Sequence, residues 1–220
     1  MIIDRLFHII LKKFFIQSSS IGQMMHTAMY FVRNGKIKGD YLEFGVMSGE
    51  SFTATCYWAK ECKLSDMRFH AFDSFEGYPK GTGMDSDASK SIYTVEYLKN
   101  LLKKNKIDLN KVTITKGWFD KTLNANTKKK LNIKKASAIF IDCGLYKSAV
   151  PIFDFITDYI QDGTLLLLGS YFSHGDSPKL GEQRAFREWL KKNPTIKATD
   201  FRNFRFVGNS FILHKLHQGR

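Results

Sequence analysis

Short apolar runs alternate along this chain with longer segments in which apolar residues recur every three or four positions. The short runs predict strands at 41–46, 68–73, 112–116, 138–142 and 164–168, and the longer segments predict helices at 23–34, 50–62, 94–104, 122–131, 147–160 and 181–192. Helices and strands that alternate in this way indicate right-handed βαβ units around a parallel sheet, which is an α/β fold. The run of leucines at 165–168 is typical of a strand that helices cover on both faces.

The C-terminal part of the chain predicts a different strand arrangement. Asn193-Pro194 ends the last helix, and residues 204–215 then alternate apolar and polar around Val207-Gly208-Asn209. This pattern is typical of an antiparallel hairpin added to one edge of the sheet, with its turn at those three residues. We therefore expect a Rossmann-like, mostly parallel seven-stranded sheet with a C-terminal antiparallel hairpin and N-terminal helices.

The first 16 residues are apolar at helical spacing, but four charged residues interrupt them, namely Asp4, Arg5, Lys12 and Lys13. A bilayer span needs ~20 apolar residues, so membrane crossing is not expected. The segment lacks a small-residue cleavage site, which argues against a signal peptide. We predict that 1–38 form an N-terminal helical segment that packs on the core or on a second copy in a homodimer, with interfacial membrane contact as a lesser alternative. The remaining chain, 39–220, forms the α/β domain.

Charge and cysteine content narrow the choice of partner and compartment. The formal net charge is +13, which suits either a polyanionic partner or lysines spread over solvated helix faces. The lysines cluster at predicted helix ends, and arginines do not interleave with aromatic residues as in RNA-binding motifs, so nucleic acid is the less favoured partner. Cys56, Cys62 and Cys143 form no C-x-x-C pair, which favours reduced thiols in a cytoplasmic protein and argues against zinc.

The stretch from Tyr41 to Ser51 is the strongest candidate for a binding loop. Its residues of interest are Glu43, Gly45, Val46, Met47, Gly49 and Ser51. An apolar run, a glycine turn and a helix start present backbone N–H groups to a nucleotide-like ligand. The form E-F-G-V-x-x-G-x-S resembles the first cofactor loop of S-adenosylmethionine-dependent methyltransferases. The helix start would then favour the methionine carboxylate, Glu43 its amino group, and Ser51 would add a hydroxyl donor. Alternatively, the glycines only satisfy positive φ angles.

A carboxylate at the end of the second predicted strand supports the same ligand. Asp73, followed by Ser74, can accept two hydrogen bonds from ribose hydroxyls, although a strand-end aspartate is often only a cap. The long irregular segment 74–91 begins at this edge of the sheet. We interpret it as a lid over the substrate rather than as a flexible insertion without a function.

Four motifs in order resemble the macrocin-type sugar O-methyltransferase family. They are Glu43-Phe-Gly-Val46, Phe72-Asp-Ser-Phe-Glu-Gly-Tyr-Pro79, Lys116-Gly-Trp-Phe-Asp-Lys-Thr-Leu123 and Ile141-Asp-Cys-Gly-Leu-Tyr-Lys-Ser148. The resemblance implies a class I methyltransferase domain over 39–220 that uses S-adenosylmethionine to methylate sugar hydroxyls. It also implies that Gly117 and Trp118 lie near the adenine, and that Asp142 lies beside the transferring methyl group and the cofactor.

One departure from the family pattern concerns magnesium. The pattern expects a second acid two positions after Asp142 and a pair of acids after the fifth strand, but this chain has Gly144 and Gly169-Ser170-Tyr171 there. Magnesium needs oxygen ligands, usually carboxylates, so we predict no metal site. The alternative is a rearranged site that recruits Asp142, Asp176 or Glu182.

Without a metal, a protein group has to accept the proton of the acceptor. Candidates are Asp142 itself and the loop residues Tyr171, His174 and Asp176, of which His174 has the most suitable pKa range. The sequence thus predicts methyl transfer from S-adenosylmethionine to a hydroxyl or amine of a sugar, glycan or small metabolite. The lost acids leave open a non-catalytic, cofactor-binding relative that acts as a partner or structural protein. A nucleic-acid methyltransferase would rest on charge alone.

Overall fold

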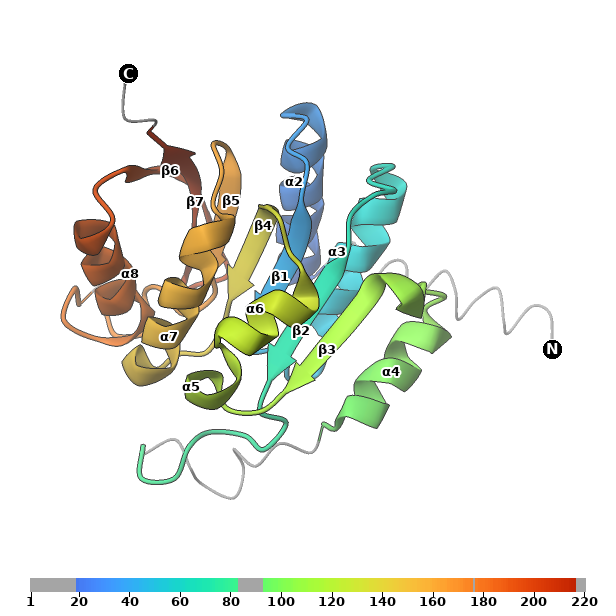
Figure 1. The fold of residues 1–220 in the computed structure, drawn as a ribbon, viewed down its shortest axis with the longest axis horizontal. Coiled ribbons are helices and arrows are strands. Elements are labelled where there is room, and N and C mark those ends of the chain that lie inside the picture. The colour runs from blue at the N-terminus through green and yellow to red at the C-terminus, as the bar shows by residue number, and fades with distance from the viewer. Residues whose placement is uncertain (1–18, 83–92, 176, 217–220) are drawn as a thin grey trace.

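The computed structural model describes residues 19–82, 93–175 and 177–216, and within them seven strands form one sheet. The strand order is β3-β2-β1-β4-β5-β7-β6 (Figure 1). The strands are β1 (Asp40–Phe44), β2 (Phe69–Asp73), β3 (Val112–Lys116), β4 (Ala136–Ile141), β5 (Thr164–Leu168), β6 (Ile196–Phe204) and β7 (Gly208–Lys215). The first five are parallel, and β7 runs antiparallel to both β5 and β6. This arrangement confirms the predicted fold class.

Helices cover both faces of the sheet (Figure 1). They are α2 (Ser20–Asn34), α3 (Glu50–Glu61), α4 (Val95–Lys104), α5 (Phe119–Thr122), α6 (Ala125–Leu131), α7 (Tyr146–Ile156) and α8 (Gly181–Lys192), with 3₁₀ turns η2 (Leu109–Lys111) and η3 (Thr157–Tyr159). Buried residues of α2, α3 and α4 share one core cluster, and those of α6, α7 and α8 share the other. The predicted helix over the first 16 residues lies outside the described residues.

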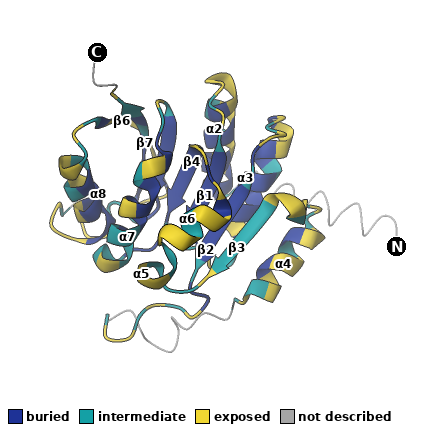
Figure 2. Ribbon diagram, in the orientation of Figure 1, coloured by how far each residue is buried: buried dark blue, intermediate teal, exposed yellow. Residues whose placement is uncertain are grey.

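The strand β5 shows why an uninterrupted apolar run belongs in the centre of such a sheet. Leu165 and Leu167 join the cluster under α2, α3 and α4, whereas Leu166 and Leu168 join the cluster under α7 and α8. Successive side chains of a strand point to opposite faces, so burial on both faces requires an apolar residue at every position. Figure 2 shows the resulting buried centre, with exposed residues on the outer surfaces of the helices.

Two helix predictions differ from the structure. The helix predicted at 122–131 is two helices, because Asn124 leaves the helical conformation and accepts a hydrogen bond from Thr127 N (3.1 Å) as the N-cap of α6. The shorter helix α5 precedes this break and begins directly after Trp118. The helix predicted at 147–160 ends as an α-helix at Ile156 and continues as η3.

The C-terminal hairpin also differs in its length and in its turn. The strand β6 begins at Ile196, eight residues earlier than predicted, because an edge strand with several exposed polar residues carries little apolar alternation. Phe204 pairs with Gly208, so the turn consists of residues 205–207 rather than 207–209. Arg205 begins this turn in a left-handed conformation (φ +52°).

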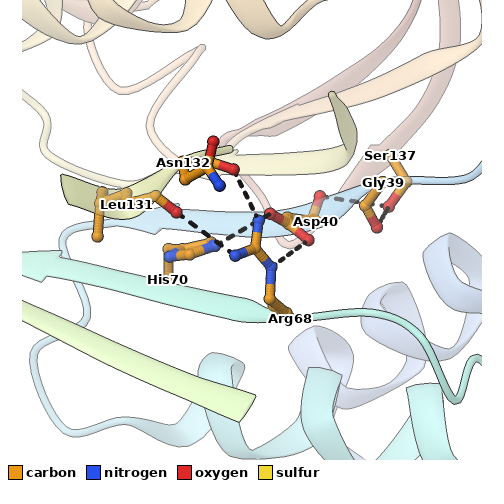
Figure 3. A network of polar contacts seen from close by, with 7 residues as sticks. All are labelled: Gly39, Asp40, Arg68, His70, Leu131, Asn132 and Ser137. Atoms are coloured by element: carbon orange, nitrogen blue, oxygen red, sulfur yellow. Dashed lines mark hydrogen bonds and ion pairs between the residues drawn. The ribbon is translucent and has the colours of Figure 1, made fainter. Parts of the chain in front are cut away.

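A polar cluster fixes the amino-terminal ends of β1 and β2, at the edge opposite the predicted ligand loops (Figure 3). Arg68 donates from Nε and Nη2 to the two oxygens of buried Asp40 (3.2 and 2.6 Å), and His70 Nε2 lies 3.2 Å from Asp40 Oδ2. Arg68 also donates to the carbonyls of Leu131 and Asn132. Burial alone would raise the pKa of Asp40, but the hydrogen bonds from His70 and Arg68 outweigh it, so this pKa is lowered.

Replacing Asp40 with asparagine should therefore cost about 2 kcal/mol of unfolding free energy at neutral pH, because a charged acceptor of several hydrogen bonds is lost. A carboxylate whose pKa is lowered by folding stabilises the fold above its unfolded pKa and loses that contribution on acidification. The difference in unfolding free energy between parent and variant should narrow as the pH falls below 3.8, the usual pKa of an aspartate. Urea unfolding at several pH values measures it, with exposed Asp66→Asn as the control. If the difference in unfolding free energy were the same at all pH values, it would not come from the ionised carboxylate of Asp40.

Candidate active site

The carboxyl ends of the parallel strands bring together the loops that carry the predicted site residues. Hydrogen bonds between neighbouring strands continue just past the strand ends: Gly45 N donates to Phe72 O (2.9 Å), and Asp142 N donates to Phe44 O (2.9 Å). Gly169 N likewise donates to Ile141 O (2.7 Å). The loops after β1, β2, β4 and β5 therefore lie side by side, where open α/β sheets bind their ligands.

Position 45 requires a glycine because the loops after β1 and β4 come very close to each other there. Its φ is +88°, and a Cβ built on it would lie 2.2 Å from the carbonyl oxygen of Asp142. A side chain at this position would push the loop after β1 away from the loop after β4. The glycine of the first motif thus sets the spacing of the loops, and buried Val46 follows it in the core.

The start of α3 is open to an anionic ligand group. Gly49 is its N-cap (φ +77°) and provides no side-chain hydrogen bond, whereas α2, α4 and α6 are each capped by a side chain, from Ser19, Thr94 and Asn124. The first N–H groups of a helix have no intrahelical partner, and the helix dipole adds a partial positive charge there. An uncapped start of this kind suits a carboxylate or a phosphate.

Glu43 lies behind this loop, fully buried. Its carboxyl oxygens accept hydrogen bonds from Tyr41 Oη (2.5 Å) and Ser51 Oγ (2.6 Å). Burial raises the pKa of Glu43 to about 8, although both hydroxyls act in the opposite direction. The hydroxyl of Ser51, which the sequence assigns to the ligand, is therefore donated to Glu43 in this structure.

Asp73 ties the first two loops together at the end of β2. Its oxygens accept hydrogen bonds from Met47 N (2.9 Å) and Phe75 N (2.7 Å). Each carboxylate oxygen has a second lone pair, and the residue is only partly buried, so Asp73 can still accept bonds from ribose hydroxyls. Ser74 instead serves its own loop, accepting from Glu76 N (3.1 Å) and donating to Gly77 O (3.2 Å).

The loop after β3 joins the same edge. Gly117 N donates to Asp73 O (2.9 Å), and Gly117 adopts φ +135°. The next residue, Trp118, is the partly buried N-cap of α5. The residues predicted to bind the ribose and the adenine are therefore neighbours in the structure. Of the predicted lid, only residues 74–82 lie within the described part.

Asp142 lies just beyond β4 and is held from two sides. Its Oδ1 accepts a hydrogen bond from Ser170 Oγ (3.1 Å), and its Oδ2 pairs with Arg205 Nη1 (2.8 Å). Arg205 comes from the tip of the C-terminal hairpin, and our sequence reasoning did not find it. No pattern in the sequence marks it, because 63 residues separate it from Asp142.

Glu182 connects the loop after β4 to the loop after β5 through hydrogen bonds to their backbones. It is fully buried at the start of α8 and accepts hydrogen bonds from the backbone N–H groups of Cys143 (2.8 Å), Gly144 (2.9 Å) and Ser170 (3.0 Å). Burial, reinforced by the negative charge of Asp142, raises the pKa of Glu182 to about 7. The carboxylate that we considered as a metal ligand is thus a support for the loops.

The other candidates for the proton acceptor have surroundings of different kinds. The ring of Tyr171 packs against Phe172 and Phe211. His174 is exposed, and its ring lies so close to Gly181 that a Cβ there would be 2.6 Å from His174 Cδ2. Asp176 lies outside the described residues. Their predicted roles remain predictions.

Tyr78 is a further residue at this centre that we did not select from the sequence. Its hydroxyl lies 3.7 Å from the position that a Cβ on Gly144 would take. Burial, reinforced by the negative charge of nearby carboxylates such as Asp142, raises the pKa of Tyr78. The phenol is therefore a neutral hydrogen-bonding group above the loop after β4.

The comparisons with known proteins agree with this geometry. A family model described as Macrocin-O-methyltransferase (TylF) matches residues 18–201. The chain belongs to the macrocin O-methyltransferase family. No curated protein matches the chain. The family's methyl donor is S-adenosylmethionine, so the predicted family and cofactor are both confirmed.

Solved structures of O-methyltransferases share the fold. NovP has a TM-score of 0.73 at 16% identity, covering 88% of this chain and 79% of its own. CalS11, a calicheamicin methyltransferase, has 0.68 at 16% identity, covering 86% and 77%. TomG from Streptomyces achromogenes, solved in complex with SAM, has 0.58 at 11% identity, covering 89% and 81%.

The macrocin family resemblance implies a magnesium ion as well as S-adenosylmethionine, and the residues present fit only the second. The uncapped start of α3 and the lone pairs of Asp73 suit the cofactor's carboxylate and ribose. For magnesium, Asp142 is the single acid of the expected set that is left, and its carboxylate is already paired with the cationic guanidinium of Arg205. Among the residues that the structure describes, no three His, Cys, Asp or Glu side chains are grouped to hold a metal ion.

Proposed function

We propose that this protein transfers the methyl group of S-adenosylmethionine to a hydroxyl of a sugar or glycosylated small metabolite without a divalent metal. The proposal is carried by Asp142, which lies beside the cofactor loops yet is paired with an arginine. The relative CalS11 is a TDP-rhamnose 3′-O-methyltransferase, which supports a sugar as the acceptor. An amine acceptor is the second class to be screened.

The cofactor would be held by backbone groups and by one carboxylate. The free N–H groups at the start of α3 bind the methionine carboxylate, and Asp73 accepts the two ribose hydroxyls. Gly117 and Trp118 lie beside Asp73, so they flank the adenine. Met47 is 64% exposed, and its backbone N–H is bonded to Asp73, which makes it a neighbour of the proposed ribose site.

The chemistry requires orientation and one proton acceptor. Bound S-adenosylmethionine would supply the methyl group, its C–S bond breaking with the electron pair left on sulfur as a C–O bond to the acceptor forms. Asp142 takes the hydroxyl proton, since it is the carboxylate at the edge where the loops after β1 and β4 meet. Proximity and exclusion of water supply much of the acceleration in such a transfer.

The sequence predictions on assembly and compartment complete the proposal. We infer a cytoplasmic protein in which 39–220 form the methyltransferase domain and 1–38 form an N-terminal helical segment for packing or dimer contact. Within that segment, α2 packs in the core cluster that also holds α3 and α4. No helix within the described part of the chain is long and apolar enough to cross a membrane. Light scattering of the full chain and of a chain starting at residue 19 would show whether the first residues mediate a dimer.

Calorimetric titration with S-adenosylmethionine tests the proposal, first with magnesium and then with a chelator. We expect equal affinity in both conditions, and equal turnover in an acceptor screen of nucleotide sugars, glycosides and amines. Turnover that disappears with the chelator would overturn the metal-free mechanism. Binding without turnover on any acceptor class would favour the non-catalytic relative, and no binding would remove the cofactor assignment.

Replacing Asp73 with alanine should weaken S-adenosylmethionine binding by roughly 10- to 100-fold, because hydrogen bonds to a charged acceptor contribute about 1.5–3 kcal/mol. The same calorimetric titration measures the change, and exposed Asp66→Ala serves as the control. Circular dichroism shows whether the variant is folded. Unchanged affinity in a folded Asp73→Ala protein would contradict the ribose assignment.

A further inference from the structure

The register of the last three strands places the hairpin tip beside the acceptor side of the site. Asn209 of β7 pairs with Leu168, the last residue of β5, and the turn 205–207 comes directly before β7. Phe172 N donates to Val207 O (2.7 Å), which fastens this turn to the loop after β5. The tip therefore has a fixed position next to Ser170.

Arg205 is held in an unfavourable backbone conformation at this tip. Its φ of +52° is one that glycine or asparagine adopts more readily than arginine. Lys36, Lys63 and Lys106 have similar φ angles, so the backbone conformation alone does not mark a function. What distinguishes Arg205 is its contact: Nη1 lies 2.8 Å from Asp142 Oδ2 while 33% of the side chain remains exposed.

The other carboxylate oxygen of Asp142, Oδ1, also has a hydrogen-bond partner. Ser170 Oγ donates to Oδ1 (3.1 Å), and the carboxyl group fills the space beside Gly169, where a Cβ would lie 2.4 Å from Asp142 Cγ. An aspartate at position 169 is thus incompatible with this placement of Asp142. A single carboxylate is matched in charge by one arginine, whereas a divalent cation needs several oxygen ligands.

We infer that Arg205 takes the place of a metal cation in the acceptor site. Its guanidinium neutralises the charge of Asp142, keeps a divalent metal from binding there and positions the carboxylate for the acceptor hydroxyl. This inference rests on the proposed function for its catalytic part. The side chain of Arg205 is 33% exposed, and the guanidinium N–H groups that are not bonded to Asp142 can donate to the acceptor oxygen as it loses its proton.

The surroundings of Asp142 explain why a cation is needed. Glu182 lies close enough for the negative charge of Asp142 to raise its pKa, and the same charge also raises the pKa of Glu43. The charge of Arg205 acts on Glu43 in the opposite direction. Without Arg205, the negative charge of the partly exposed Asp142 would lie near Glu182 and Glu43 with no neighbouring cation to offset it.

A metal titration tests the exclusion independently of any acceptor. Ser170→Asp adds a second carboxylate, and Mn²⁺ binding to this variant is followed by electron paramagnetic resonance. Removing Arg205 as well, in Ser170→Asp/Arg205→Ala, should strengthen Mn²⁺ binding about tenfold or more, because a positive charge next to the ion is lost. The matched control is Ser170→Asp/Arg202→Ala, which removes an exposed arginine of the same hairpin. Equal affinity in all three variants, or tight Mn²⁺ binding to the parent that Asp142→Asn abolishes, would overturn the inference.

A second measurement tests the positioning role. Arg205→Ala should keep its S-adenosylmethionine affinity within about threefold of the parent and lose about tenfold or more in turnover on the acceptor found by the screen. Millimolar guanidinium should restore part of that turnover, and Arg205→Lys should lie between parent and alanine variant. Turnover of Arg205→Ala equal to the parent, or a loss that guanidinium does not relieve, would overturn the role. If the parent binds no S-adenosylmethionine, the proposed function fails while the Mn²⁺ result still decides the metal exclusion.

Discussion

Replacing Asp142 with asparagine should lower turnover about 10²- to 10⁴-fold, which is the usual range for losing a positioned proton acceptor. The amide oxygen can still accept the hydrogen bond from Arg205, and the amide NH₂ can donate to Ser170 Oγ, so the loops after β4 and β5 should keep their places. It cannot take a proton from the acceptor hydroxyl. S-adenosylmethionine affinity should therefore stay within about threefold of the parent.

The outcome for Asp142→Asn separates the two roles that the sequence left open for this residue. A loss of cofactor affinity equal to the loss of turnover would make Asp142 a ligand of the cofactor rather than the base. His174→Ala should bind the cofactor like the parent, and a larger loss of turnover there than in Asp142→Asn would make His174 the base. Asp162→Asn, at the far edge of the sheet and 73% exposed, is the control for generic charge effects.

The parallel part of the fold could be predicted because its physics is local. A strand buried on both faces must be apolar at every position, and the leucines of β5 show this without any knowledge of their neighbours. The break between α5 and α6 was missed because Asn124 is compatible with a helix until its capping bond to Thr127 is known. The hairpin was predicted, but the early start of β6 at Ile196 was missed, because a polar edge strand depends on its partner β7 for its hydrogen bonds.

The position of the loops that carry the predicted cofactor residues could be predicted for a related reason. Glycines and an acid at strand ends mark the loops after β1 and β2, and a parallel sheet brings all such loops to one edge. The acceptor half depends on contacts that no sequence pattern encodes. Arg205 reaches Asp142 because of the register between β5 and β7, and Glu182 reaches the same loops from the start of α8.

The stability of the parent should fall as the pH rises from about 5 to about 8, and Glu43→Gln should remove much of this dependence. Burial raises the pKa of Glu43 from its usual 4.5 to about 8. Between these values the folded protein holds a proton that the unfolded chain releases, so each step upward in pH favours unfolding until the pH passes 8. The stability of Glu43→Gln relative to the parent should then increase by several kcal/mol from pH 5 to pH 9. Glu182, whose pKa is about 7, contributes equally to both proteins and cancels in the difference.

The same buried proton connects stability to cofactor binding. S-adenosylmethionine carries a positive sulfonium and a positive amino group, and a cation near Glu43 favours the ionised carboxylate. Binding at neutral pH should therefore release a proton from the parent and none from Glu43→Gln. Calorimetric titrations in two buffers of different ionisation enthalpy measure this release directly. Equal proton release by the two proteins would mean that Glu43 stays neutral when the cofactor binds, and its hydrogen bonds to Tyr41 and Ser51 would then be its whole contribution to the loop.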